Sequence, residues 1–162
     1  MINVAKGPID KLLGYAIRAE IDSDRIYTEM SNRVKNPLLV QKFRILAFEE
    51  QKHKTILERL FQSMYPGATP EVPEKVDPKL LPAVIIRPSS DLVDILGQAM
   101  DAEKSAQTLY SGMAKRVELG KKKILEYLSK VERSHYLMLR SEYVMAQQFA
   151  DYGEKDIDKV TT

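Results

Sequence analysis

Apolar residues recur along the chain in alternating steps of three and four, a spacing that keeps one face of an α-helix against a partner. Four such seams run from Ile9 to Val34, from Leu39 to Met64, from Leu92 to Val117 and from Leu125 to Phe149. The pattern predicts four helices of roughly 30 residues each, and therefore an all-α protein built as a four-helix bundle.

Cap signals place the ends of these helices. Three starts are predicted, at Gly7-Pro8, at Asn36-Pro37 and at Ser89-Ser90-Asp91. Gly120 marks the predicted break before the fourth helix. That helix should continue to about Gly153, where a glycine and a polar tail follow.

A proline-rich segment divides the chain into two pairs of helices. Six prolines fall between Pro66 and Pro88, and residues 65–89 are expected to form a crossover. A helix of about 27 residues is roughly 40 Å long, whereas about 23 extended residues reach roughly 80 Å, so the crossover can run the full length of the bundle. The second and third helices are then parallel, within one domain of residues 1–150 that a short tail, 151–162, follows.

Acidic residues interrupt all four seams near their middle, twice with a histidine three residues later. The interrupting residues are Glu20, Glu50, His53, Glu103, Glu132 and His135. The two histidines are the only ones in the chain. Residues three apart on a helix are neighbours, with about 5 to 6 Å between Cβ atoms, so each Glu-x-x-His pair can bind one ion.

The two halves of the chain repeat each other. The stretches AEIDSDRIYTEMSNRV (19–34) and AEKSAQTLYSGMAKRV (102–117) share alanine, glutamate, tyrosine, methionine, arginine and valine in register. A Glu-x-x-His pair follows the glutamate of each stretch. The halves are therefore predicted to be two copies of one helical hairpin, joined by the crossover and related by a pseudo-twofold axis that brings the four glutamates to one level.

Two ions at this level would balance the charges. Four ionised glutamates in an apolar core are prohibitively costly alone, and two divalent ions offset their charge. We therefore predict that all six interrupting residues are metal ligands, with Glu20 and Glu103 in bridging or terminal roles. Such ligands suit iron and manganese alike, so both metals stay open. The alternative is a metal-free structural bundle, because a lone Glu-x-x-His pair is common on solvated helix surfaces.

We also predict the roles or positions of four residues near the predicted ligands. Tyr27 and Tyr110 each lie seven residues after a seam glutamate. Two roles are open for these tyrosines. Each can pack in the core like any other aromatic residue, or its hydroxyl can act in catalysis by forming a hydrogen bond to a ligand carboxylate. Glu49 faces away from the seam by one residue and is expected on the surface. Glu142 lies on the fourth seam beyond His135, where we expect the bundle to open to solvent.

Composition narrows the class of protein. The chain has no cysteine, which excludes thiolate nucleophiles, cysteine-ligated clusters and disulfides, and fits a reducing compartment. Charged residues make up 30% of the chain but sum to a formal +2, so the charge does not indicate a nucleic acid partner. The N-terminal MINVAKGPID has no apolar signal region, and no stretch approaches the roughly 18 apolar residues of a membrane span. We expect a soluble, cytoplasmic protein.

The combined motif resembles a known family. Along the chain it is Glu20, Glu50-x-x-His53, Glu103 and Glu132-x-x-His135. Together with Tyr27 and the long central connection, it resembles the ferritin-like di-iron superfamily over residues 8–150, and most of all its rubrerythrin branch. The resemblance implies a ferritin-like bundle with two iron ions that reduces hydrogen peroxide to water. It also implies an external electron donor such as a rubredoxin, because the tail is too short for a rubredoxin domain and has no cysteine.

Ala106 departs from this resemblance. Rubrerythrins typically carry an extra glutamate one turn after the third-helix ligand, where this chain has Ala106. The remaining four glutamates and two histidines are closer to the ferroxidase centre of bacterioferritins. A ferroxidase or iron-storage protein that uses oxygen is therefore one alternative, and a di-manganese, catalase-like protein is another. The oligomer that we expect is a homodimer.

Overall fold

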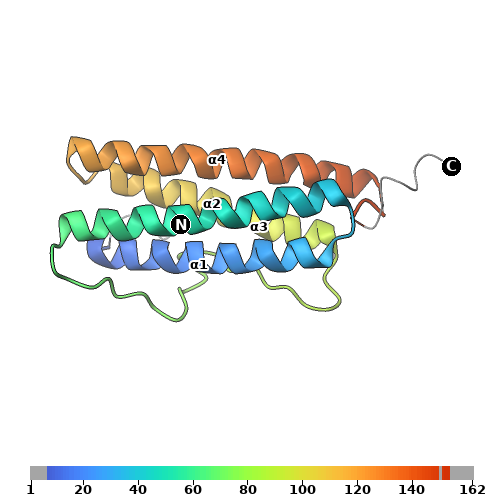
Figure 1. The fold of residues 1–162 in the computed structure, drawn as a ribbon, viewed down its shortest axis with the longest axis horizontal. Coiled ribbons are helices and arrows are strands. Elements are labelled where there is room, and N and C mark those ends of the chain that lie inside the picture. The colour runs from blue at the N-terminus through green and yellow to red at the C-terminus, as the bar shows by residue number, and fades with distance from the viewer. Residues whose placement is uncertain (1–6, 150, 154–162) are drawn as a thin grey trace.

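The computed structural model describes residues 7–149 and 151–153 of the chain. In these residues four helices form and no strand, and the helices are α1 (Ile9–Arg33), α2 (Pro37–Met64), α3 (Leu92–Ala114) and α4 (Leu119–Gln148). Figure 1 shows them side by side, with α2 and α3 running in one direction and α1 and α4 in the other. The four-helix bundle and its parallel second and third helices are therefore confirmed. No helix in this part of the chain combines the length and hydrophobicity that a membrane span needs.

Capping side chains set the predicted starts of α2 and α3. Asn36 accepts a hydrogen bond from a first-turn amide at 3.0 Å, and Asp91 accepts one at 2.7 Å. These bonds satisfy amides that the first turn of a helix leaves without a partner. The predicted break at Gly120 is wrong, because Gly120 already lies in the first turn of α4 and the chain breaks at 115–118.

The chain after α4 folds back onto the start of α2. Phe149 leaves the helix with an extended backbone, at φ −124° and ψ 102°. The Gly153 carbonyl then accepts hydrogen bonds from the amides of Lys35 and Asn36, at 2.8 and 3.2 Å. These bonds hold Gly153 beside the start of α2, and α4 ends at Gln148, short of the predicted end near Gly153.

The crossover between α2 and α3 lies along one side of the bundle, against α1 (Figure 1). Arg18 on α1 holds it by donating a hydrogen bond from Nε to the carbonyl of Pro73 at 2.6 Å. Gly14 allows a close approach, because a Cβ there would lie 2.1 Å from the carbonyl oxygen of Glu71. Leu81 is buried in the core, so the crossover contributes to packing as well as joining the helices.

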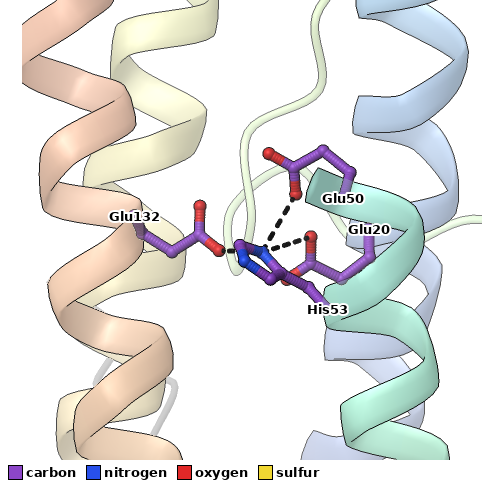
Figure 2. A group of neighbouring side chains, drawn as sticks. All are labelled: Glu20, Glu50, His53 and Glu132. Carbon is purple, nitrogen blue, oxygen red and sulfur yellow. Dashed lines mark ion pairs between the residues drawn. The ribbon is translucent and has the colours of Figure 1, made fainter. Parts of the chain in front are cut away.

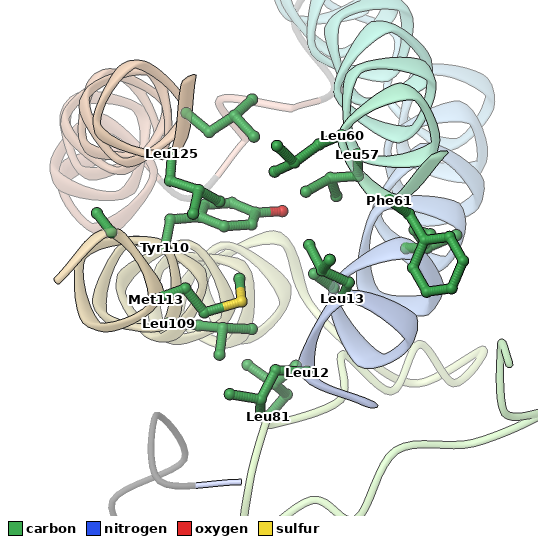
Figure 3. Packing of buried hydrophobic residues seen from close by; sticks show 14 residues of the cluster. Leu12, Leu13, Leu57, Leu60, Phe61, Leu81, Leu109, Tyr110, Met113 and Leu125 are labelled. Carbon is green, nitrogen blue, oxygen red and sulfur yellow. The ribbon is translucent and has the colours of Figure 1, made fainter. Parts of the chain in front are cut away.

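Two apolar clusters fill the bundle on either side of a polar layer. The layer consists of Glu20, Glu50, His53, Glu103, Glu132 and His135. One cluster includes Leu13 and Leu125, and Figure 3 shows it meeting Leu81 of the crossover. The other includes Phe43 and Leu96. Burying a large apolar side chain contributes roughly 1.5–3 kcal/mol, so the clusters fix the four helices above and below the layer and hold its residues in place.

Candidate metal centre

The structure brings together all six residues that the sequence predicted as ligands. They come from all four helices, as Glu20 on α1, Glu50 and His53 on α2, Glu103 on α3, and Glu132 and His135 on α4. Each is at most 3% exposed. The polar layer is therefore a buried cluster of four carboxyl and two imidazole groups, and bulk water does not solvate its charges.

The donor atoms of the layer form two overlapping groups of four, each within a span of 4.8 Å. The groups are Glu20, Glu50, His53 and Glu132, and Glu50, Glu103, Glu132 and His135. Figure 2 shows the first group, with the three carboxylates turned toward the ring of His53. Glu50 and Glu132 belong to both groups, whereas Glu20 and Glu103 each belong to one. Of the two roles left open for Glu20 and Glu103, this placement favours the terminal one.

Both histidines turn Nδ1 toward the shared carboxylates. Nδ1 of His53 lies 2.8 Å from Glu132 and 3.5 Å from Glu50. Nδ1 of His135 lies 3.0 and 3.3 Å from oxygens of Glu50 and Glu132. The two rings are nearly parallel, with centroids 5.5 Å apart and 17° between their planes. The same ring nitrogen of each histidine is therefore available to an ion.

Five buried atoms of the layer have no hydrogen-bond partner within the part of the chain that the structure describes. They are Oε1 of Glu50, both carboxylate oxygens of Glu132, and Nδ1 of each histidine. An unsatisfied buried polar group costs roughly 1–3 kcal/mol, and these atoms approach one another without hydrogen-bond alignment, as ligand atoms around a common centre do. Carboxylate oxygen and imidazole nitrogen bind iron and manganese. The residues therefore fit two divalent ions, which offset the charge of the four carboxylates.

Without ions, the layer holds protons. Burial, together with nearby carboxylates, raises the pKa of Glu50 well above its usual value, and burial raises the pKa of Glu132 to about 8. Burial alone would lower the pKa of His53, but the carboxylates around it, Glu132 first, raise it to about 12. Burial would raise the pKa of Glu103, yet its contacts with Glu132 and a histidine lower it. Ion binding must therefore displace protons from the layer.

Tyr27 and Tyr110 donate hydrogen bonds across the bundle. The Tyr27 hydroxyl on α1 bonds to Glu103 on α3, and the Tyr110 hydroxyl on α3 bonds to Glu20 on α1. Burial, and then the charge of the carboxylates, raises the pKa of both tyrosines, so the phenols keep their protons. The reciprocal bonds follow the pseudo-twofold axis predicted from the repeat. Of the two roles open for the tyrosines, hydrogen bonding to a seam carboxylate is confirmed, and a catalytic role stays a prediction.

Glu49 has a partner in the layer that the sequence did not suggest. Its side chain is 38% exposed, in line with a position near the surface. Its Oε2, however, lies 2.6 Å from Nε2 of His135, the ring nitrogen that is not turned toward the shared carboxylates. Glu49 is one residue off the seam of its own helix, and only the packing of α2 on α4 brings His135 to it.

Glu142 is buried, so its predicted position at a solvent-open end of the bundle is wrong. It is 3% exposed and forms an ion pair with Lys42 of α2. The Tyr152 hydroxyl donates a second hydrogen bond to it. The residues after α4 fold back and cover this end of the bundle, and a buried carboxylate is tolerated there because a cation and a hydroxyl compensate it.

A cavity of about 90 Å³ reaches the polar layer from the side of the crossover. Among the described residues, Tyr27, Glu103 and Ala106 line it and the two histidines do not. Much of its wall is made of small residues and of the crossover, including Ala19, Ser23, Ala99, Ala102, Pro82 and Ala83. A small molecule can therefore approach the carboxylates between α1 and α3, and the cavity also reaches Glu50 of α2 and Glu132 of α4.

Comparisons with known proteins agree with this fold. The family model described as Rubrerythrin matches residues 11–143. A solved structure of a hypothetical protein from Pyrococcus furiosus is 33% identical, with a TM-score of 0.76, and the match covers 89% of this chain and 93% of that one. No curated protein matches. Because the family match spans most of the chain and includes the whole polar layer, the chain belongs to the rubrerythrin family.

Proposed function

We propose that this protein is a di-iron oxidoreductase that reduces hydrogen peroxide to water, with electrons from a separate protein such as a rubredoxin. The observation that carries the proposal is the polar layer, in which two groups of donor atoms share Glu50 and Glu132 and five buried atoms lack a hydrogen-bond partner. When bound, two ferrous ions supply the two electrons that one peroxide molecule needs to become two water molecules. Membership of the rubrerythrin family supports this class of reaction.

The residues of the layer divide into shared and terminal ligands. Glu50 and Glu132 would each contact both ions, because their oxygens belong to both groups. One histidine and one further glutamate complete each position, namely His53 with Glu20 and His135 with Glu103. Each histidine offers Nδ1, which has no hydrogen-bond partner of its own. Four helices thus fix the ligand set before any ion binds, which limits the reorganisation that binding requires.

Tyr27 is better placed than Tyr110 to act on a substrate. Tyr27 lines the cavity together with Glu103, to which its hydroxyl donates a hydrogen bond, whereas Tyr110 is not among the described lining residues. This bond fixes the Glu103 carboxylate where the cavity meets the layer. The pKa of Tyr27 is raised by burial, so the hydroxyl holds a proton at the cavity wall at neutral pH. Reduction of peroxide to two waters consumes two protons, and the Tyr27 hydroxyl can deliver one.

The size of the cavity limits what can react. A space of about 90 Å³ accommodates a molecule of a few heavy atoms, since one water occupies about 30 Å³ in the liquid. The crossover covers the outer side, with Pro82 and Ala83 on the wall. Hydrogen peroxide and oxygen both fit this space, so the cavity supports a small oxidant without choosing between the two.

Ala106 favours a second candidate function, a ferroxidase. It lines the cavity one helical turn after Glu103, at the position where rubrerythrins typically have a further glutamate. With alanine there, the set is four glutamates and two histidines, as in a ferroxidase centre. A ferroxidase would consume oxygen and would oxidise added ferrous iron well beyond two ions per chain. Manganese in the same ligands would instead support catalase-like chemistry.

Stopped-flow oxidation of the diferrous protein separates these functions. The proposal expects oxidation by hydrogen peroxide to be much faster than oxidation by oxygen, and sustained turnover to need a one-electron donor, because the chain has no cysteine for a second iron site. Tyr27→Phe should slow the peroxide reaction more than Tyr110→Phe, since only Tyr27 lines the cavity. Faster oxidation by oxygen, or iron that accumulates past two per chain, would replace the proposal with the ferroxidase.

A further inference from the structure

The two halves of the polar layer differ at the position next to each shared glutamate. The repeat aligns Glu50 with Glu132 and His53 with His135. One residue earlier, α2 has Glu49 and α4 has Val131. A charged acceptor thus stands in one half where the other half has an apolar side chain.

Glu49 contacts the outer nitrogen of one histidine only. Its Oε2 lies 2.6 Å from Nε2 of His135, while Nδ1 of the same ring lies 3.0 Å from Glu50. A carboxylate acceptor at Nε2 holds a proton on that nitrogen, so Nδ1 is the ring nitrogen left to bind an ion. The bond also fixes the rotation of the ring, so Glu49 prepares His135 for ligation.

His53 has no such support. Within the described part of the chain, its polar contacts, to Glu20, Glu50 and Glu132, all involve Nδ1. Val131 holds the position equivalent to Glu49, and its side chain cannot accept a hydrogen bond. No described residue outside the layer therefore selects the tautomer of His53. The tautomer that binds an ion is selected only when the ion binds.

We infer that Glu49 is a positioning residue for His135, and that the two ion positions are unequal as a result. The position made by Glu50, Glu103, Glu132 and His135 fills first, and the position that includes His53 fills second. The inference rests on the proposed metal centre, but it concerns the binding of ions and not the oxidant. Loss of a hydrogen-bonding partner behind a metal-bound histidine typically weakens metal affinity about 10- to 100-fold.

Zinc titration followed by nuclear magnetic resonance tests this order directly. The chain has two histidines, so its imidazole spectrum contains two ring systems, and zinc is diamagnetic. The first equivalent of zinc should shift the His135 ring, and the second should shift the His53 ring. The Nε2 proton of His135 should exchange slowly with water because it is held by Glu49.

Substitutions of Glu49 should change this order. Glu49→Ala should weaken the first binding step about 10- to 100-fold and abolish the preference for His135. Glu49→Gln should stay within a few-fold of the wild-type affinity, because its amide oxygen still accepts the Nε2 proton. Glu58→Ala is the matched control, since Glu58 is a partly exposed glutamate of the same helix whose ion pair, among the described residues, is with Lys54, at 3.2 Å. It should leave both binding steps and the order unchanged.

Val131→Glu tests the inference from the other half of the layer. It offers His53 the partner that it lacks and should strengthen the second binding step, which keeps the test decisive even if Glu49→Ala does not fold. If Glu49→Ala bound two zinc ions with the affinities and the filling order of the wild type, the positioning role of Glu49 would be overturned and the metal centre would stand. A wild-type chain that binds fewer than two zinc ions would instead overturn the metal centre on which the proposed function rests.

Discussion

Removing the ions should reverse the way in which the stability of this protein responds to pH. The ion-free chain should be more stable at pH 5.5 than at pH 7.5, because its buried layer retains protons that the unfolded chain releases. The ion-loaded chain should be less stable at pH 5.5, because its ligands must lose protons to hold the ions. The test therefore compares the stability of the same chain at two pH values, two units apart, with and without metal.

Glu132 sets the size of the effect in the ion-free chain. Burial raises its pKa in the folded state from 4.5 to about 8, so the unfolded chain binds fewer protons than the folded one between these values. Stability then falls as the pH rises, by about 1.4 kcal/mol per pH unit and retained proton. From pH 5.5 to 7.5 this amounts to roughly 2–3 kcal/mol of unfolding free energy for one such retained proton.

Other groups of the layer also act within this interval. The pKa of Glu50 is raised well above its usual value, so Glu50 acts in the same direction as Glu132. The pKa of His53 is raised to about 12, so its contribution to stability is fully present below the unfolded value of 6.5 and is progressively lost above it. His53 therefore acts in the same direction as Glu132. The pKa of Glu103 is lowered, so its contribution is lost only when the pH falls below the usual value of 4.5, outside the interval.

Urea denaturation at both pH values, with and without manganese, measures the effect. Glu132→Gln should reduce the pH dependence of the ion-free chain but not abolish it, because Glu50 and His53 also hold protons that the unfolded chain releases. Glu126→Gln should leave the pH dependence unchanged, because Glu126 is exposed on the same helix. Its Oε1 lies 3.9 Å from Nζ of Lys122. If the stability of the ion-free and the loaded chain shifted in the same direction, the layer would not exchange protons for ions.

Three further sets of substitutions test separate parts of the account. His53→Ala and His135→Ala should each leave close to one ion per chain in a calorimetric titration at limiting metal, and a variant that still binds two ions with wild-type affinity would remove that histidine from the ligands. Ala106→Glu, on the cavity wall, should preserve or raise the preference for peroxide over oxygen in stopped-flow oxidation, and a reduced preference would contradict the peroxidase proposal. Gly14→Ala should lower the unfolding free energy by about 1–3 kcal/mol, because the added Cβ would lie 2.1 Å from the carbonyl oxygen of Glu71. An unchanged urea midpoint would show that the crossover can move away from α1 at little cost in free energy.

The bundle and the polar layer could be predicted because both follow from the helical spacing of apolar residues along the sequence. Seams at helical spacing fix which face of each helix is buried, and a glutamate on such a face must then be buried as well. The repeat adds a second constraint, since two similar hairpins place Glu20 and Glu103 at equivalent positions. The reciprocal bonds of Tyr27 and Tyr110 follow the same symmetry.

Contacts that depend on how separate elements pack could not be predicted in the same way. Glu49 is off the seam of α2, and its bond to His135 depends on the approach of α4. Glu142 lies on the fourth seam, but its hydrogen bond from Tyr152 depends on the turn that follows α4, and no periodicity describes that turn. Periodicity shows which face of a helix is buried, but it does not show which neighbour covers its edges.

Metal analysis of protein isolated from its native host shows whether one chain holds two iron ions in the polar layer. We expect two iron ions per chain, and their loss when Glu50 and Glu132, which belong to both donor groups, are replaced by glutamine. Two manganese ions would keep the metal centre but exclude the iron chemistry. A native chain with no bound metal, or one whose metal survives both replacements, would rule out a metal centre in the polar layer.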